Sequence, residues 1–233
     1  MYFTCSGSGR PVVFLHGWGC DGQIFRSVAS RLPDYTCYLP DFDGFGASMP
    51  VSKIGKTVDD YADDLAEFLA QNQIVSPVLI GHSFGCRVAA AYAARKKSDV
   101  AGLLFVAPAG IRRFSLAREV KIVRYKLCKF MRGIGFCRKL PSGSDDYNAC
   151  PPHLKRTFLN VVNQDLSDRF KAIDAPTLIV CGDADTATPL KDCRRINKLV
   201  LGSELVKICG DHFALFRSPA AFAQIVRLFV QSV

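Results

Sequence analysis

Short apolar runs alternate with amphipathic stretches along this chain, and this alternation most constrains its fold. The apolar runs are PVVFLHG (11–17), YTCYLPD (35–41), PVLIG (77–81), VAGLLFVAP (100–108), PTLIVCG (176–182) and ELVKIC (204–209). Strands that are apolar on both faces are typical of parallel sheets covered by helices on both sides. We therefore expect an α/β fold with a mostly parallel, doubly wound sheet.

The stretches between these runs have the pattern of helices. The clearest covers residues 57–72, where Thr57 and Asp60 fit a capping box and the apolar residues share one helical face. Further helices are expected over residues 22–32, from Phe84 to Lys97, and from about Pro219 onward. The hydrophobic content of 49% suffices for one core.

Residues 110–172 interrupt the alternation, because they contain no clear strand. We expect a core domain of residues 1–109 and 173–233, with a helical insertion between them. Within 114–136 the apolar residues have helical spacing. Ten Lys or Arg and one acid lie within 111–140, an excess equal to the net charge of +9 of the whole chain. The rest is close to neutral, which disfavours a nucleic-acid-binding protein.

This basic insertion is open to two interpretations. Its apolar face would cover a ligand pocket, as a lid does. Alternatively, its basic face would dock an acidic carrier protein or another anionic surface.

The composition also bears on where the protein resides. No apolar run is long enough to span a membrane, and the N-terminal residues lack the pattern of a signal peptide. We expect a cytoplasmic protein.

Its ten cysteines include no CxxC pair, so we expect neither a zinc ribbon nor a redox motif. We expect reduced thiols, with Cys181 acting as a small buried hydrophobic residue.

The stretch GHSFG places Ser83 between Gly81 and Gly85, where an expected strand meets an expected helix. A tight turn there would push the serine side chain outward, while crowded backbone would require small residues on either side. This is the pattern of a nucleophile elbow. The backbone N–H of Phe84, at the start of the helix, would stabilise an oxyanion. A glycine-rich phosphate-binding turn or a plain tight joint is the alternative.

A serine nucleophile needs a general base. The chain has four histidines, and His212 follows the last expected strand, which places it at the same sheet edge as Ser83. We expect His212 to be the base. We expect His16 to brace its loop, His82 to point away as a structural residue, and His153 to lie at a surface or in the insertion.

The acid that orients the histidine should follow the strand before it. Asp183 and Asp185 both lie just beyond the run at 176–182. Either would complete the chain order Ser, Asp, His of this kind of hydrolase.

These motifs together resemble the α/β-hydrolase superfamily, in particular small lidded esterases with an HGWG loop. The matching stretches are VVFLHGWG, PDFDGFGAS, LIGHSFG, CGDADTATP and GDHFALFRSP. The resemblance implies that Asp185 is the acid, because Gly182, Asp185 and Pro189 fit G-x-x-D-x-x-x-P. It also implies that the Trp18 N–H is the second oxyanion donor.

The resemblance also concerns the position of the insertion and the N-terminal edge of the sheet. It implies that the insertion follows the sixth strand of the family's usual sheet. Similar proteins carry an extra β-hairpin before the HG strand, whereas about ten residues precede Pro11 here. We therefore expect a shortened N-terminal edge of the sheet.

The expected activity is hydrolysis of a small-molecule or acyl-chain ester through an acyl-enzyme, with neither metal nor cofactor. Thioester or carrier-linked acyl ester hydrolysis, C–C bond hydrolysis and acyl transfer remain open on the same triad. A non-catalytic ligand-binding protein is a further alternative. The serine argues against dehalogenases and epoxide hydrolases, which resemble this fold but use aspartate at the elbow.

Overall fold

The computed structural model describes residues 1–49, 51–96, 99–112 and 145–233. The helix expected within 114–136, and with it most of the basic segment, lies outside the described residues. No helix in the described ranges is both long enough and apolar enough to cross a membrane.

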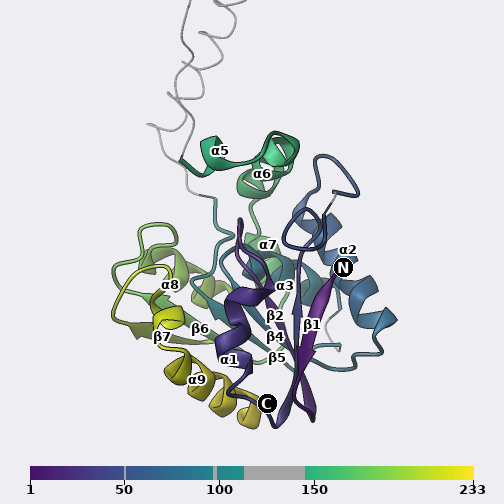
Figure 1. Cartoon of the computed structure of the whole chain (residues 1–233). Coiled ribbons are helices and arrows are strands. Elements are labelled where there is room, and N and C mark those ends of the chain that lie inside the picture. The colour runs from purple at the N-terminus through teal and green to yellow at the C-terminus, as the bar shows by residue number, and fades with distance from the viewer. Residues whose placement is uncertain (50, 97–98, 113–144) are drawn as a thin grey trace, which may run out of the picture.

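The described strands form one seven-stranded sheet in the order β1-β3-β2-β4-β5-β6-β7. Their bounds are β1 Phe3–Ser6, β2 Arg10–Leu15, β3 Tyr35–Pro40, β4 Val78–His82, β5 Gly102–Val106, β6 Thr177–Gly182 and β7 Glu204–Ile208. All neighbours pair in parallel except β1, which is antiparallel to β3. The mostly parallel sheet is confirmed, and its N-terminal edge is the single short strand β1 (Figure 1).

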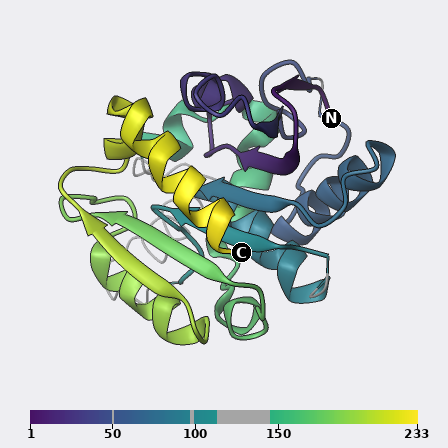
Figure 2. The ribbon, with the colours of Figure 1, turned by 90° about the horizontal axis from the view of Figure 1, so that it is seen from below.

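Helices cover both faces of this sheet (Figures 1 and 2). α1 and α9 contact each other on one face, while α2, α3, α7 and α8 form a contacting row on the other. The helical elements are η1 Gly22–Phe25, α1 Arg26–Ala29, α2 Val58–Gln71, α3 Phe84–Arg95, α5 Asp145–Ala149, η2 Pro152–Leu154, α6 Lys155–Asn163, α7 Ser167–Lys171, α8 Leu190–Leu199, η3 Ala214–Arg217 and α9 Pro219–Ser232.

The apolar runs of the sequence divide between two hydrophobic cores, one on each face. In β2, Val13 and Leu15 belong to the core under α2 and α3, whereas Val12 and Phe14 belong to the core under α1 and α9. The division follows from the strand period of two, which turns successive side chains to opposite faces. This is why the central strands are apolar throughout.

The predicted helix bounds agree best with the structure where a cap defines the end of the helix. Thr57 and Asp60 form the expected capping box at the start of α2. The helix expected over 22–32 is shorter, with a 3-10 turn η1 followed by α1, which ends at Ala29. Pro33 closes that stretch, since proline cannot extend a helix.

One expectation about the cysteines is wrong. Cys181, at the end of β6, forms a disulfide with Cys193 of α8. Both side chains are fully buried. The sequence offered no CxxC signal because the two cysteines are 12 residues apart and meet only when α8 folds back beside β6.

A buried histidine holds the loop that follows β2. The Phe42 N–H donates to His16 Nε2 at 3.0 Å, so this nitrogen carries no proton. His16 Nδ1 is therefore the donor to the Gly17 carbonyl oxygen at 2.8 Å. Burial lowers the pKa of His16 to about 4, so the ring is neutral. His16 braces its loop, as expected from the sequence.

Reduction of the Cys181–Cys193 disulfide should lower the free energy of unfolding by about 3 kcal/mol, because the cross-link closes a short loop in the unfolded chain. Urea unfolding with and without a reductant measures this. The Cys193→Ala variant is the control, since its unfolding should not respond to the reductant. An unchanged transition in the native chain would contradict the disulfide.

Acid should destabilise the protein through His16. Its pKa of about 4 in the folded state lies below the ordinary histidine pKa of 6.5, so the unfolded state binds more protons between these values. This stability is complete above pH ~6.5 and falls by about 2–3 kcal/mol by pH ~4.5. Urea midpoints of the native chain and His16→Gln at both pH values test this. Equal losses in the two proteins would refute it, because every other histidine is common to both.

Candidate active site

Ser83 occupies a strained turn between β4 and α3. Its φ of 50° and ψ of −102° lie in a region that residues other than glycine rarely adopt. A Cβ at Gly81 would lie 2.7 Å from the Cys86 nitrogen, and one at Gly85 would lie 2.0 Å from the Leu15 carbonyl oxygen. Both flanking glycines are thus required by close backbone contact, as the sequence pattern predicts.

The turn is held by backbone hydrogen bonds that leave the start of α3 open. The Ser83 N–H donates to the Val106 carbonyl at 3.0 Å, and the Ser83 carbonyl accepts from the Cys86 N–H at 3.2 Å. Phe84 is the first residue of α3, so its N–H has no acceptor within the helix. This N–H lies at the positive end of the helix dipole.

His212 and Asp185 form a hydrogen-bonded pair at the carboxyl edge of the sheet. His212 Nδ1 lies 2.7 Å from Asp185 Oδ2. A carboxylate only accepts, so Nδ1 carries the proton and Nε2 is left as the basic nitrogen of the neutral ring. The Asp185 side chain is fully buried, whereas that of His212 is 16% exposed.

Asp185 is ionised in this setting. Burial alone would raise its pKa, but the hydrogen bonds from His212 and Thr188 outweigh burial and lower the pKa below its ordinary value. The N–H groups of Ala187 and Thr188 each donate to Asp185 Oδ1 at 2.8 Å. A fixed negative charge therefore lies behind the His212 ring.

The structure brings Ser83 and His212 to the same edge without a hydrogen bond between them in the described part of the chain. The residue before the serine makes the connection. His82 Nε2 donates to the His212 carbonyl oxygen at 3.1 Å, and the two rings lie 4.7 Å apart. His82 is therefore structural, but it does not point away from the site as expected.

The other candidates lie outside this arrangement. Asp183 is exposed, and its Oδ1 accepts from the Gly210 N–H at 3.0 Å, which ties two loops together. His153 is exposed in η2. No group of His, Cys, Asp or Glu side chains in the described ranges is arranged to hold a metal ion.

The loop after β2 lies directly against the elbow. A Cβ at Gly17 would lie 2.8 Å from His82 Nδ1 and 3.7 Å from the Ser83 Cβ. The Cys20 N–H donates to the Gly17 carbonyl at 3.2 Å, which closes a tight turn around Trp18. The backbone of Gly17, the residue before Trp18, thus lies beside Ser83.

Aromatic rings cover the neighbourhood of Ser83. The Trp18 ring packs edge to face on Phe45, Phe84 and Phe158, with centroids 5.0–5.4 Å apart. Phe158 belongs to α6, between β5 and β6, and contacts Tyr147 of α5 at 6.2 Å. Helices of the insertion therefore contribute to the apolar surroundings of the elbow.

Thr188 is the site residue that sequence reasoning missed. Its Oγ1 lies 2.8 Å from Asp185 Oδ2 and 3.0 Å from the Ala107 carbonyl oxygen. It links the Asp185 loop to the end of β5. Its position three residues after the aspartate was a usable signal, since a hydroxyl at that spacing can reach back to a carboxylate.

Two cavities of the described residues lie elsewhere. One, of 360 Å³, includes Asp43, Lys56 and Asp64 among its lining residues, and the other, of 340 Å³, lies between the ends of α2 and α3. Neither is lined by Ser83, Asp185 or His212. We assign neither to the substrate of this site.

Known proteins with similar sequences cover almost all of this chain. AB hydrolase superfamily protein YisY of Bacillus subtilis is 25% identical, with 97% of this chain and 93% of the relative covered. Pimeloyl-[acyl-carrier protein] methyl ester esterase of Vibrio cholerae is also 25% identical, over 96% of this chain and 95% of the relative.

Solved structures support the fold. A thermophilic esterase from Thermogutta terrifontis matches with a TM-score of 0.78 at 23% identity, covering 99% of this chain and 93% of that chain. The sequence profile of the Alpha/beta hydrolase family matches residues 12–225, which include most of β2, the elbow and the Asp185–His212 pair. The chain therefore belongs to the alpha/beta hydrolase family.

Proposed function

We propose that this protein is a serine hydrolase that cleaves carboxylic esters. One observation carries the proposal: the 2.7 Å pair of His212 and buried Asp185 lies at the sheet edge where strained Ser83 leaves β4. A nucleophile, a base and an orienting acid are the parts that acyl transfer needs. Membership of the family supports the same chemistry.

In the proposed reaction each group has one distinct role. Ser83 Oγ attacks the ester carbonyl carbon while His212 Nε2 takes its proton. Asp185 stabilises the imidazolium through Nδ1–H. The Trp18 and Phe84 N–H groups donate to the oxyanion, and His212 returns the proton to the departing alcohol. Water then attacks the acyl-enzyme by the same route in reverse.

The missing Ser83–His212 hydrogen bond fits this mechanism. Catalytic hydrogen bonds are often long in the free enzyme and tighten when substrate binds. The Asp185–His212 pair already fixes the ring tautomer that leaves Nε2 free.

An apolar acyl group suits the surroundings of Ser83. Trp18, Phe84 and Phe158 offer aromatic faces and no charge. The relatives include Lipase 1 of Psychrobacter immobilis and pimeloyl-[acyl-carrier protein] methyl ester esterase of Vibrio cholerae, and the second name states an ester as the substrate. We expect a small or acyl-chain ester as substrate.

We also propose that residues 110–172 act as a lid over this site. Figure 1 draws α5 and α6 above the sheet, and Phe158 of α6 rests on Trp18. A hydrogen bond joins the two ends of this segment, since the Leu166 N–H donates to the Gly110 carbonyl at 2.9 Å. Buried Arg87 of α3 donates to the Val161 and Gln164 carbonyls, which attaches the end of α6 to the elbow helix.

A fluorophosphonate probe should label the native chain at Ser83 and fail to label Ser83→Ala. Turnover of p-nitrophenyl esters of increasing chain length then gives the acyl preference. Asp185→Asn should lower kcat by about 10⁴-fold, because the His212 tautomer is no longer fixed. Asp183→Asn is the matched control and should stay within about threefold.

A folded native protein that the probe does not label would contradict the proposal. Equal losses in Asp183→Asn and Asp185→Asn would reassign the acid. Labelling without turnover of any ester would favour a different acyl reaction on the same residues.

As an alternative substrate class on the same triad, we propose carrier-linked acyl esters. Several similar proteins are named pimeloyl-[acyl-carrier protein] methyl ester esterase. The insertion of this chain has a basic segment at 111–140, and carrier proteins of this kind are acidic partners that a basic surface attracts.

Raising the salt concentration from about 0.05 to 0.5 M should increase KM for a carrier-linked ester and leave KM for a p-nitrophenyl ester unchanged. The Lys121→Glu/Arg124→Glu variant should reproduce the increase at low salt. Lys191→Glu/Lys198→Glu on α8 carries the same charge change outside the insertion and is the control. A KM for the carrier-linked ester that does not respond to salt would overturn carrier docking.

A further inference from the structure

His82 is buried beside the proposed base and serves no step of the proposed mechanism. It is 1% exposed, and its Nδ1 has no hydrogen-bond partner among the residues that the structure describes. An unpartnered buried acceptor costs on the order of 1–3 kcal/mol. A polar ring kept in such a place calls for a compensating role.

The ring of His82 touches the three segments that must come together. His82 itself is the residue before Ser83, at the end of β4. On one side lies the backbone of Gly17, in the loop that carries Trp18. On the other, His82 Nε2 donates to the His212 carbonyl oxygen at 3.1 Å.

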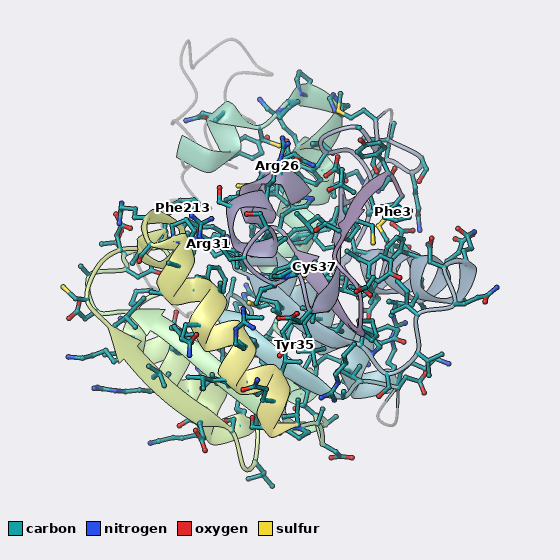
Figure 3. The ribbon with its side chains drawn as sticks, turned by 60° about the horizontal axis from the view of Figure 1, so that its bottom comes forward. Phe3, Arg26, Arg31, Tyr35, Cys37 and Phe213 are labelled. Atoms are coloured by element: carbon teal, nitrogen blue, oxygen red, sulfur yellow. A yellow bond between two sulfur atoms is a disulfide. The ribbon has the colours of Figure 1, made fainter. Side chains whose placement is uncertain are left out.

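Aromatic contacts fix the ring in this position. His82 packs on Phe216 of η3 at 4.8 Å and on Phe213 at 5.2 Å. Phe213 follows His212 and is labelled in Figure 3 near the start of α9; it is 42% exposed. The segment that carries His212 thus rests on His82 through one hydrogen bond and two rings.

The charge state of His82 suits this place. Burial, with a smaller contribution from the nearby His212, lowers the pKa of His82 to about 3. His82 is therefore neutral while His212 gains and loses its proton. A second imidazolium 4.7 Å away would oppose that step.

We propose that His82 is a positioning residue, which holds the His212 segment against the elbow through the Nε2–H to carbonyl hydrogen bond. This inference rests on the proposed function of Ser83 and His212. The hydrogen bond acts on the backbone of His212, so it sets where Nε2 stands relative to Ser83 Oγ. Small displacements of a catalytic group cost large factors in rate.

Two variants separate the hydrogen bond from the packing. His82→Leu keeps the bulk and removes the N–H, whereas His82→Gln keeps an N–H donor that can reach the His212 carbonyl. We expect His82→Leu to lower kcat per fluorophosphonate-labelled site tenfold to about a hundredfold, with KM within about twofold. His82→Gln should recover kcat to within about threefold.

Phe68→Leu is the control for lost stability. Phe68 is buried and packs on Phe3 and Tyr38, without a ring contact to His82, Phe213 or Phe216 in the described structure. It should lower the melting temperature and leave kcat per labelled site unchanged. Normal kcat per labelled site in His82→Leu would overturn the proposal, because a purely structural role reduces only the number of folded sites.

A second readout needs no substrate. The proton between His212 Nδ1 and Asp185 Oδ2 should give a low-field NMR resonance in the native chain and in His82→Gln. In His82→Leu we expect this resonance to broaden through faster exchange with water. An unchanged resonance in His82→Leu would count against positioning by His82. Absence of probe labelling in the native chain would instead refute the proposed function.

Discussion

The contact between Gly85 and the backbone of Leu15 is the constraint on which the site depends. No side chain fits there, since a Cβ would lie 2.0 Å from the Leu15 carbonyl oxygen. This closeness accompanies the sharp turn that strains Ser83, which remains partly accessible to solvent. It also draws the end of β2 to the start of α3, so that the Trp18 loop and the Phe84 N–H flank one serine. The strain at Ser83 is maintained by the surrounding core.

The parallel sheet brings the loops that carry the remaining residues of the candidate site to the same edge. β2, β4, β5, β6 and β7 are successive neighbours in the sheet, and each ends in a loop that contributes to the candidate site, with His212 in the loop after β7. Thr188 reaches the Ala107 carbonyl and the Asp185 carboxylate, so the loops after β5 and β6 hold each other. Buried Arg87 extends this support to α6. Contacts to backbone carbonyl groups therefore hold the loops of the candidate site more than ion pairs do.

Three histidines near Ser83 differ because of their environments. His16 and His82 are fully buried, so desolvation keeps them neutral and leaves them as fixed hydrogen-bonding rings. His212 keeps partial contact with solvent and has a carboxylate behind it. This combination suits the proposed role of His212 as the general base. Histidine thus provides two structural residues, His16 and His82, and one proposed base, His212, within one site.

Apolar periodicity and glycine spacing alone determined the α/β class, the elbow around Ser83 and the edge at which His212 and Asp185 meet, because a parallel sheet leaves few places for its loops. Chain-order reasoning could not choose between Asp183 and Asp185, since both follow β6; the 2.7 Å contact of Asp185 with His212 distinguishes them. The hydrogen bond from Thr188 to the Ala107 carbonyl, the Cys181–Cys193 disulfide and the link from His82 to His212 arose only in the tertiary structure. Each joins segments whose approach depends on how helices and loops pack, and local sequence patterns do not encode such distances.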